Sequence, residues 1–276
     1  MRNALPDLGA TWKSKPVQNG RDKVTNVGAT SEYYHFEDLN DGVVRLFRSA
    51  QTAVAASPSV LDLGCGRARL GLEIERLGFT VTGIDGSAVA CETARGRISE
   101  VIELDLMQRE EIVATLNGRR FDWLLAADVL EHMRDSEEAL KFYAQFLKRD
   151  GYLVLSLPNV AVWDNRLRLL FGRFNYTDSG VLDRTHLRFF TFRTAKQLVI
   201  DAGFTPLRVT WEPGIARAFL PVLKRVFAAK SQEPAVILDS SLYKAYSRYF
   251  LPIEHFICGI APGLLAFRIV ILAQIH

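Results

Sequence analysis

The sequence is poor in cysteine and carries little net charge. Its three cysteines, Cys65, Cys91 and Cys258, are far apart and form no CxxC pair, so neither a disulfide scaffold nor a cysteine-ligated metal is expected. A formal net charge of +3 is too close to neutrality to predict a nucleic-acid partner. Residues 1–28 also lack the continuous apolar segment of a secretory signal. These absences favour a cytoplasmic protein with reduced thiols.

Long apolar runs are absent as well. The most apolar stretch, residues 250–275, is interrupted by prolines and by charged side chains such as Glu254 and Arg268. A membrane-spanning helix needs roughly 18 consecutive apolar residues, so none is expected. Residues 217–230 combine apolar side chains with Arg and Lys. This pattern is compatible with peripheral contact at the inner membrane face and also with packing against a sheet edge.

Ample apolar material for a globular core is present, since 49% of the 276 residues are hydrophobic. Between residues 57 and 159, short apolar runs alternate with segments of helical spacing. This alternation predicts a parallel sheet built by right-handed crossovers, with helices on both faces. The predicted strands are 59–63, 80–84, 101–104, 121–127 and 152–157, and the predicted helices are 69–77, 87–95, 109–116 and 137–147.

The rest of the chain divides into parts around this core. Residues 1–28 are expected to form a flexible tail, and 29–56 a helical segment in which Asn40 or Asp41 caps a helix over 41–56. An insertion at 160–193, rich in arginine and aromatic residues, is expected to cap the sheet. Residues 194–276 complete the sheet, with a helix at 194–202, strands at 206–211 and 266–273, and a helical excursion at 214–264.

The most informative string is DLGCG, residues 62–66, where the first predicted strand ends. Gly64 and Gly66 permit positive φ and let a ligand approach the backbone without a Cβ in the way. Asp85 ends the second predicted strand, 21 positions after Gly64. A carboxylate at this place can accept hydrogen bonds from both hydroxyls of a ribose.

Two classes of cofactor suit a glycine turn of this kind. A dinucleotide needs G-x-G-x-x-G with a pyrophosphate at the helix N-terminus, but Arg69 stands where the third glycine is required. Asp62 lies just ahead of the turn, where its negative charge suits a ligand with an amino group better than a phosphate. The turn therefore favours a cofactor other than a dinucleotide.

The string DLGCG resembles the first motif of the class I S-adenosylmethionine-dependent methyltransferases. Residues 83–85 (GID) are similar to the second motif of that family and residues 104–106 (LDL) to the third. Residues 121–122 (FD), followed by 128–132 (DVLEH), are similar to the fourth motif with the EH segment after it. The family often has glycine where Ala68 stands. The resemblance implies a Rossmann-like, seven-stranded, mostly parallel sheet and S-adenosylmethionine as cofactor. It covers about residues 55–275.

The resemblance also implies roles for single residues. Gly64 and Gly66 would flank the methionine part of the cofactor, and Asp85 would hold the ribose. Asp105 would receive the adenine amino group, and the backbone N–H of Leu106 would meet the ring. Three further residues are assigned to the cofactor site: Asp62, Cys65, whose thiol is expected only to pack, and Asp128, on the sulfonium side.

Two of the five histidines are candidate catalytic residues. Methyl transfer needs a base only if the acceptor is protonated, as a hydroxyl is, and imidazole titrates in the right range. His132 belongs to the EH pair, which resembles that of small-molecule O-methyltransferases such as the ubiquinone-biosynthesis group. His186 lies in a segment, LDRTHLRFF, that resembles one in methyltransferase-11/23-like enzymes. A structural histidine that bonds loop backbone remains an alternative for each.

We therefore expect an S-adenosylmethionine-dependent methyltransferase that acts on a small-molecule or glycan/lipid-precursor acceptor, with O-methylation favoured and no metal required. Arginines and aromatics of the 160–193 insertion could form a lid over such an acceptor. The alternative is a solvated amphipathic helix whose arginine stems cover apolar surface. A catalytically silent cofactor-fold partner or regulatory subunit is the alternative from another class. A nicotinamide oxidoreductase is disfavoured by the missing third glycine.

Overall fold

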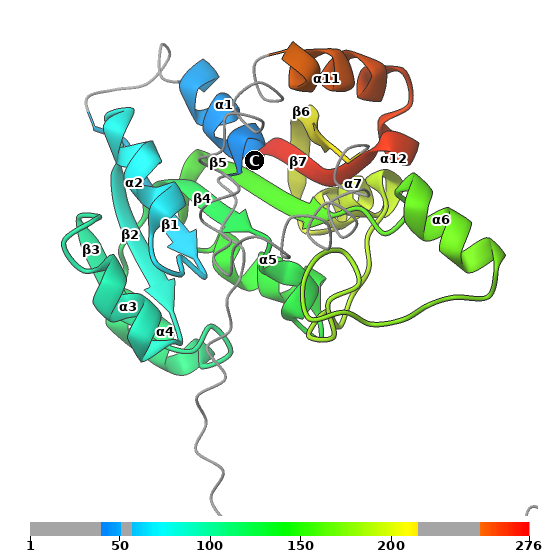
Figure 1. Cartoon of the computed structure of the whole chain (residues 1–276). Helices are drawn as coiled ribbons and strands as arrows, with labels where there is room; N and C mark the ends of the chain where they lie inside the picture. The colour runs from blue at the N-terminus through cyan, green and yellow to red at the C-terminus, as the bar shows by residue number, and fades with distance from the viewer. Residues whose placement is uncertain (1–39, 51–56, 215–248, 276) are drawn as a thin grey trace, which may run out of the picture. The chain divides into compact units, whose positions relative to one another are not determined.

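The computed structural model describes residues 40–50, 57–214 and 249–275. It contains a seven-stranded sheet of order β3-β2-β1-β4-β5-β7-β6. The first five strands run parallel, and β7 is antiparallel to both of its neighbours. This is the predicted Rossmann-like, mostly parallel sheet (Figure 1). The strands are β1 (Ser59–Leu63), β2 (Thr80–Asp85), β3 (Glu100–Glu103), β4 (Phe121–Ala127), β5 (Leu147–Pro158), β6 (Phe204–Pro213) and β7 (Ala266–Ile275).

Helices cover both faces of the sheet, because each face has its own apolar cluster. One cluster receives side chains from α1, α2 and α3, and the other receives them from α4, α5 and α7. The helical elements of the described residues are α1 (Asp41–Ala50), α2 (Arg69–Arg76), α3 (Ala88–Ala94), α4 (Arg109–Leu116), the 3-10 turn η2 (Leu130–His132), α5 (Ser136–Ala144), α6 (Trp163–Leu170), α7 (Phe192–Asp201), α11 (Leu251–Ile260) and α12 (Pro262–Leu265).

Helix α1 begins where the sequence predicts. The side chain of Asn40 accepts a hydrogen bond from the backbone N–H of Val43 at 3.2 Å, which caps the first turn. Farther along the helix, the ring of Phe47 lies 5.1 Å from both Phe79 and Trp123. The cap and these aromatic contacts fix α1 against the sheet.

Several element boundaries differ from the prediction. The helix expected over 137–147 ends at Ala144, and β5 already begins at Leu147 instead of at residue 152. The carbonyl of Phe146 accepts a hydrogen bond from the N–H of Phe121 at 2.8 Å. The backbone here pairs with β4 instead of continuing the helix. Helix α7 begins at Phe192, two residues before the prediction, because Thr191 and Thr194 form a reciprocal capping box.

The insertion after β5 contains one helix, α6, and a long loop that returns to α7 (Figure 1). Helical structure is also found in the described part of the second excursion, as α11 and α12. The expected tail at 1–28 and the basic apolar stretch at 217–230 lie outside the described residues. Among the helices that the structure describes, none has the length and apolarity to cross a membrane.

Candidate functional site

The candidate cofactor residues lie at the carboxyl ends of four neighbouring parallel strands. The glycine loop follows β1, and Asp85 is the last residue of β2. Asp105 comes after β3, and Asp128 comes after β4. In the strand order β3-β2-β1-β4, the residues form one row along the edge where ligands bind in doubly wound sheets.

The loop after β1 requires its glycines. Gly64 and Gly66 have φ values of 65° and 54°, in the left-handed region that favours glycine. A Cβ on Gly64 would lie 2.8 Å from Cγ2 of Val129, so any larger residue also meets the segment after β4. Ala68, where the resembling family often has glycine, has φ 56° and is fully buried. Because Gly64 and Gly66 have no Cβ, a ligand can approach the backbone of this loop.

Asp85 organises the loop on both sides. Its Oδ2 accepts from the N–H of Gly66 at 2.8 Å, and its Oδ1 accepts from the N–H of Ser87 at 2.8 Å. Each ionised carboxylate oxygen can accept a second bond, which leaves capacity for a diol. Asp85 therefore holds the glycine loop in place and can still bind a ribose.

Asp62 is a buried acid beside this loop. Its residue is only 3% exposed, and burial together with the charge of Asp85 raises the pKa of Asp62 to about 8. A carboxyl group in this state gains most from a neighbouring cation, because a cation compensates the charge that burial disfavours. An ammonium group is therefore the ligand feature that suits Asp62 best.

Cys65 packs, as expected. A Cβ on Gly83 would come within 2.6 Å of the Cys65 Sγ, so the thiol fills the space that this glycine leaves. Burial raises the pKa of the Cys65 thiol above its ordinary range, which keeps it protonated. A buried, protonated thiol of this kind is a poor nucleophile.

Asp105 and Leu106 form the end of the site at β3. Oδ1 of Asp105 accepts from the N–H of Met107 at 2.9 Å, and the carbonyl of Leu106 accepts from the hydroxyl of Tyr143 at 2.7 Å. A Cβ on Gly86 would lie 3.5 Å from the Cα of Asp105, so the turns after β2 and β3 approach closely. The two strand ends therefore make a continuous surface.

Asp128 occupies a more constrained place than the sequence indicates. It has φ 55°, although it is not a glycine. Its Oδ1 accepts from the hydroxyl of Ser156 at 2.9 Å, and its Oδ2 forms an ion pair with Arg268 at 2.8 Å. The carboxylate is thus already compensated by a cation of the chain itself.

Sequence reasoning missed Arg268 as a partner of this site. Its side chain is 12% exposed and also pairs with Glu212 of β6 at 2.7 Å. Glu212 in turn accepts from the N–H of Gly42 at the start of α1. The available signal was a single charged residue within the apolar string AFRIVILA of β7. A charge in a buried strand requires a partner of opposite sign.

His132 and His186 are brought together although 54 positions separate them. Their ring centroids lie 4.8 Å apart. The loop that carries His186 is held on η2 by two backbone bonds, from the N–H groups of Leu187 and Arg188 to the carbonyl of Glu131 at 2.8 and 3.0 Å. The insertion and the segment after β4 therefore form one catalytic candidate.

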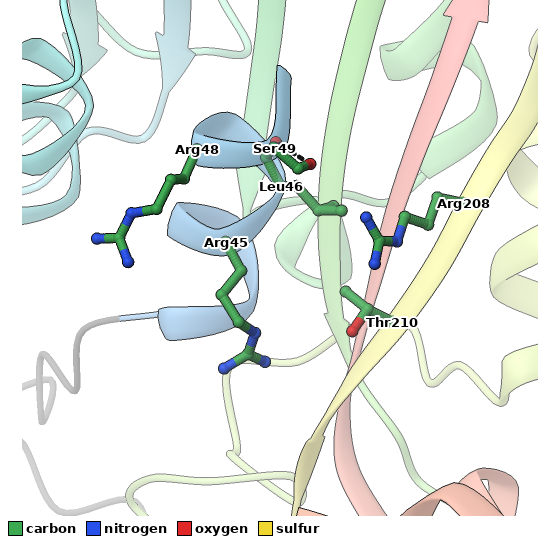
Figure 2. A pocket seen from close by; sticks show the side chains of 6 residues that line it. All are labelled: Arg45, Leu46, Arg48, Ser49, Arg208 and Thr210. Carbon is green, nitrogen blue, oxygen red and sulfur yellow. Dashed lines mark hydrogen bonds between the residues drawn. The ribbon is translucent and has the colours of Figure 1, made fainter. Parts of the chain in front are cut away.

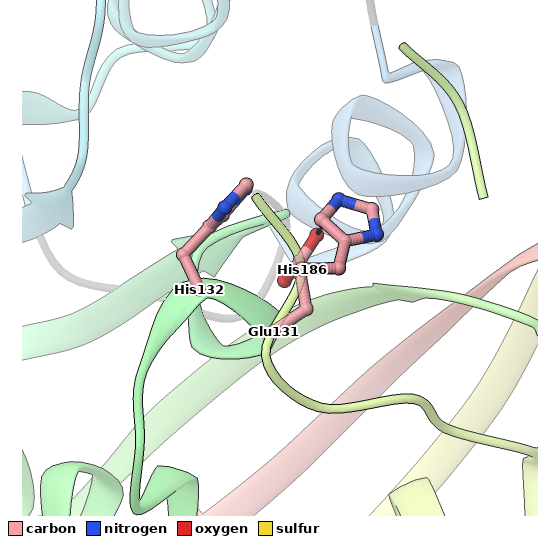
Figure 3. A group of neighbouring side chains, drawn as sticks. All are labelled: Glu131, His132 and His186. Carbon is pink, nitrogen blue, oxygen red and sulfur yellow. Dashed lines mark ion pairs between the residues drawn. The ribbon is translucent and has the colours of Figure 1, made fainter. Parts of the chain in front are cut away.

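Glu131 lies beside these histidines (Figure 3). Its side chain is 1% exposed, and Oε1 is 4.0 Å from Nε2 of His186. Burial, and next the charge of Asp128, raise the pKa of Glu131 well above its ordinary value. Ligand atoms of Glu131, His132 and His186 all lie within 4.8 Å of one another, so these three residues could hold a metal ion.

A separate cavity of about 360 Å³ lies between α1 and β6 (Figure 2). It contains none of the predicted site residues. Three arginines give it a positive lining, which comprises Arg45, Leu46, Arg48, Ser49, Arg208 and Thr210.

Comparison with known proteins gives one consistent result. The model of the methyltransferase domain family matches residues 32–209. A ubiquinone biosynthesis O-methyltransferase of Alkalilimnicola ehrlichii is 34% identical over 103 residues, which are 36% of this chain and 41% of that protein. The corresponding protein of Caulobacter vibrioides is 36% identical over 105 residues, 37% of this chain and 41% of that protein. The chain thus spans about two fifths of the length of both relatives.

Solved structures agree on the fold. A crystal structure of an S-adenosylmethionine-dependent methyltransferase from Archaeoglobus fulgidus has a TM-score of 0.53 and 18% sequence identity, and the match covers 85% of this chain and 93% of that one. At this identity the likeness concerns the sheet and its helices alone.

Proposed function

The chain belongs to the methyltransferase domain family of the class I, S-adenosylmethionine-dependent type, and from this we propose that it methylates a hydroxyl group of a small-molecule or glycan/lipid-precursor acceptor. The observation that carries the proposal is the pairing of His132 with His186 beside the end of β4, adjacent to the glycine loop. The family leaves no place for the nicotinamide alternative.

The residues along the strand ends fit S-adenosylmethionine, which when bound supplies a methyl group on a sulfonium. The buried carboxyl of Asp62 suits the cofactor's ammonium group. Asp85 would hold the ribose, and Asp105 with Leu106 the adenine, while Gly64, Gly66 and Asp128 would line the methionine side. Cys65 would contribute packing against Gly83 only.

The two imidazoles would take the proton of the acceptor hydroxyl. Nδ1 of His132 lies 3.3 Å from the carbonyl of Thr185, and Nδ1 of His186 lies 3.1 Å from the carbonyl of Val181. A carbonyl can only accept, so both rings carry their proton on Nδ1 when neutral and keep a lone pair on Nε2. A lone pair held in a fixed direction is what a general base requires.

Methyl incorporation from labelled S-adenosylmethionine into a fractionated cell extract tests this function. We expect the chain to label a small-molecule fraction and the Asp85→Ala variant to label it poorly. A chain that binds S-adenosylhomocysteine but labels no fraction would instead be the silent partner or regulatory subunit.

We also propose a peripheral contact with the inner membrane face. Helix α11 exposes one apolar stripe, since Ile253, Phe256 and Ile260 are 57%, 77% and 77% exposed. Helix α6 exposes its last residue, Leu170, and the following Phe171, together with several arginines. An apolar surface with basic neighbours binds anionic lipid interfaces, where a lipid-linked acceptor would be found.

A further inference from the structure

The side chain of Glu131 is buried without the hydrogen bonds that a carboxyl group normally has. Both of its oxygen atoms are inaccessible and have no hydrogen-bond partner among the described residues. The residue is 1% exposed. Leaving such a group unpaired costs free energy, so a ligand that contacts it is expected.

The surroundings of Glu131 favour a cation as that ligand. Asp128 and Asp183 both add negative charge near its carboxyl group. Arg268 faces this region as well, but its guanidinium is committed to Asp128 and Glu212 at 2.8 and 2.7 Å. The field at Glu131 thus attracts positive charge that the neighbouring arginine only partly supplies.

One ring nitrogen of each histidine lies within 4.8 Å of a carboxylate oxygen of Glu131 (Figure 3). Their Nδ1 atoms face the carbonyls of Thr185 and Val181, which fixes the tautomer that leaves the lone pair on Nε2. Backbone carbonyls commonly hold the second nitrogen of metal-ligating histidines in this way. The backbone carbonyls that orient metal-ligating histidines are therefore present at both rings.

We propose that Glu131, His132 and His186 bind one divalent transition-metal ion of the zinc class. Two imidazoles and one carboxylate are a donor set for zinc or ferrous iron with positions left open. The donor atoms lie within 4.8 Å of one another, whereas tetrahedral ligands at about 2.1 Å from zinc are roughly 3.4 Å apart. Binding of the ion would therefore shorten the distances between the donor atoms by about an ångström.

The ion deepens the proposed function and rests on it. Its open positions would hold the oxygen of the acceptor, and a metal-bound hydroxyl loses its proton at lower pH than a free one. His132 and His186 would then act as ligands and not as bases: the ion would lower the pKa of the acceptor hydroxyl, and its proton would leave to solvent.

Calorimetric titration of the chelator-treated full chain with Zn²⁺ and Co²⁺, with S-adenosylhomocysteine present, tests the site. We expect one ion per chain and an affinity that falls at least tenfold in Glu131→Gln and in His186→Ala. His255→Ala is the matched control, because His255 lies against Trp211 and Arg45 and its removal leaves the affinity unchanged. Wild-type protein without saturable uptake, or uptake that both ligand variants retain, overturns the proposal.

A second variant guards against loss of fold. His186→Cys keeps a metal-binding side chain, and with Co²⁺ it should add a thiolate-to-cobalt absorption band. S-adenosylhomocysteine affinity reports the fold of each variant, and a folded His186→Cys protein without that band counts against the site. A chelated chain that takes up no ion but still transfers methyl groups overturns the metal site alone. A chain that binds the ion at these residues but labels no acceptor overturns the methyl transfer alone.

Discussion

At the scale of single residues, two buried carboxyl groups do different work. Asp62 lies at the end of β1, just before the glycine loop, and its ionisation is opposed by burial and by the charge of Asp85. Glu131 lies in the turn η2 after β4, with its Oε1 4.0 Å from Nε2 of His186. Burying either carboxyl group costs folding free energy, and a neighbouring cation would offset this cost. An ammonium group would serve at Asp62 and a metal ion at Glu131.

Asp62→Asn should stabilise the empty protein and weaken its binding of S-adenosylhomocysteine. The unfolded chain loses the Asp62 proton near pH 3.8, whereas the folded chain keeps it up to about pH 8. The folded state therefore binds more protons over this window, and its stability falls as pH rises from about 4 to 8. We expect the gain in Tm from Asp62→Asn to be larger at pH 8 than at pH 5.

The ligand side of this prediction has its own control. 5′-Methylthioadenosine lacks the amino-acid part of S-adenosylhomocysteine, so its affinity should be the same in wild type and Asp62→Asn. Calorimetry that finds both ligands weakened equally would mean that Asp62 does not face the ammonium group.

Asp85→Ala should weaken S-adenosylhomocysteine binding by about thirty-fold or more. Two hydrogen bonds from a ribose to a charged acceptor are together worth roughly 2–4 kcal/mol. The variant also removes the bonds that hold the N–H groups of Gly66 and Ser87. Glu92→Ala, an exposed carboxylate on α3, is the control and should bind normally. Unchanged affinity in Asp85→Ala would remove this residue from the site.

His132→Ala and His186→Ala should each lower turnover by roughly 10²–10⁴, with little change in cofactor affinity. Either role of the imidazoles, base or metal ligand, acts on the acceptor oxygen and not on the cofactor. Initial rates with the identified acceptor, with His255→Ala as control, provide the measurement. Full turnover in both variants would contradict a catalytic role for either histidine.

At the scale of elements, the sequence predicts what local pattern encodes. The β–α alternation, the glycine loop and the acids at strand ends are all contained in short strings, and each lies where its string predicts. The boundary between α5 and β5 was misplaced because Phe146 and Leu147 suit either element, and pairing with β4 decides between them. A local sequence pattern cannot predict a boundary that is set by pairing with a strand distant in the sequence.

Two contacts could not be predicted from the sequence for a related reason: that of His132 with His186, and that of Asp128 with Arg268. The loop that carries His186 has no periodicity, and its place is fixed by backbone bonds to the carbonyl of Glu131. Arg268 reaches Asp128 only because β7 inserts antiparallel beside β5, which the residues of β7 alone do not specify.

Arg268→Met should destabilise the fold by about 3 kcal/mol, near the lower end expected for breaking a buried ion pair, because the side chain of Asp128 is 28% exposed. The variant leaves Asp128 and Glu212 without their cation and loosens the link from β6 to α1. Chemical denaturation measures the loss. Arg95→Met, which breaks the exposed pair with Glu103, is the control and should cost less than about 1 kcal/mol.

At the scale of the whole molecule, apolar surface gathers on the elements that follow β5 and precede β7. The guanidinium of Arg166 on α6 donates to the carbonyl of Gly263 in α12 at 3.3 Å, so the two excursions from the sheet lie together (Figure 1). Both carry exposed apolar side chains, Leu170 and Phe171 on one and Phe256 and Ile260 on the other. This apolar surface thus belongs to the two insertions, and not to the ends of β1 to β3, where the candidate cofactor residues lie.

The chain should therefore co-sediment with anionic liposomes at low salt and be released as salt rises, because basic side chains near the surface are screened at higher ionic strength. Replacing Phe256 and Ile260 together by serine should reduce binding by at least tenfold, since each aromatic or aliphatic side chain contributes roughly 1.5–3 kcal/mol when fully buried. Leu207→Ser, at an exposed apolar position on β6, is the matched control and should bind as wild type does. If wild-type protein stays in the supernatant at low salt, the membrane contact is wrong and the stripe on α11 has another partner. If binding survives the double substitution, the lipid surface is met by other residues, and the apolar face of α11 is not the contact.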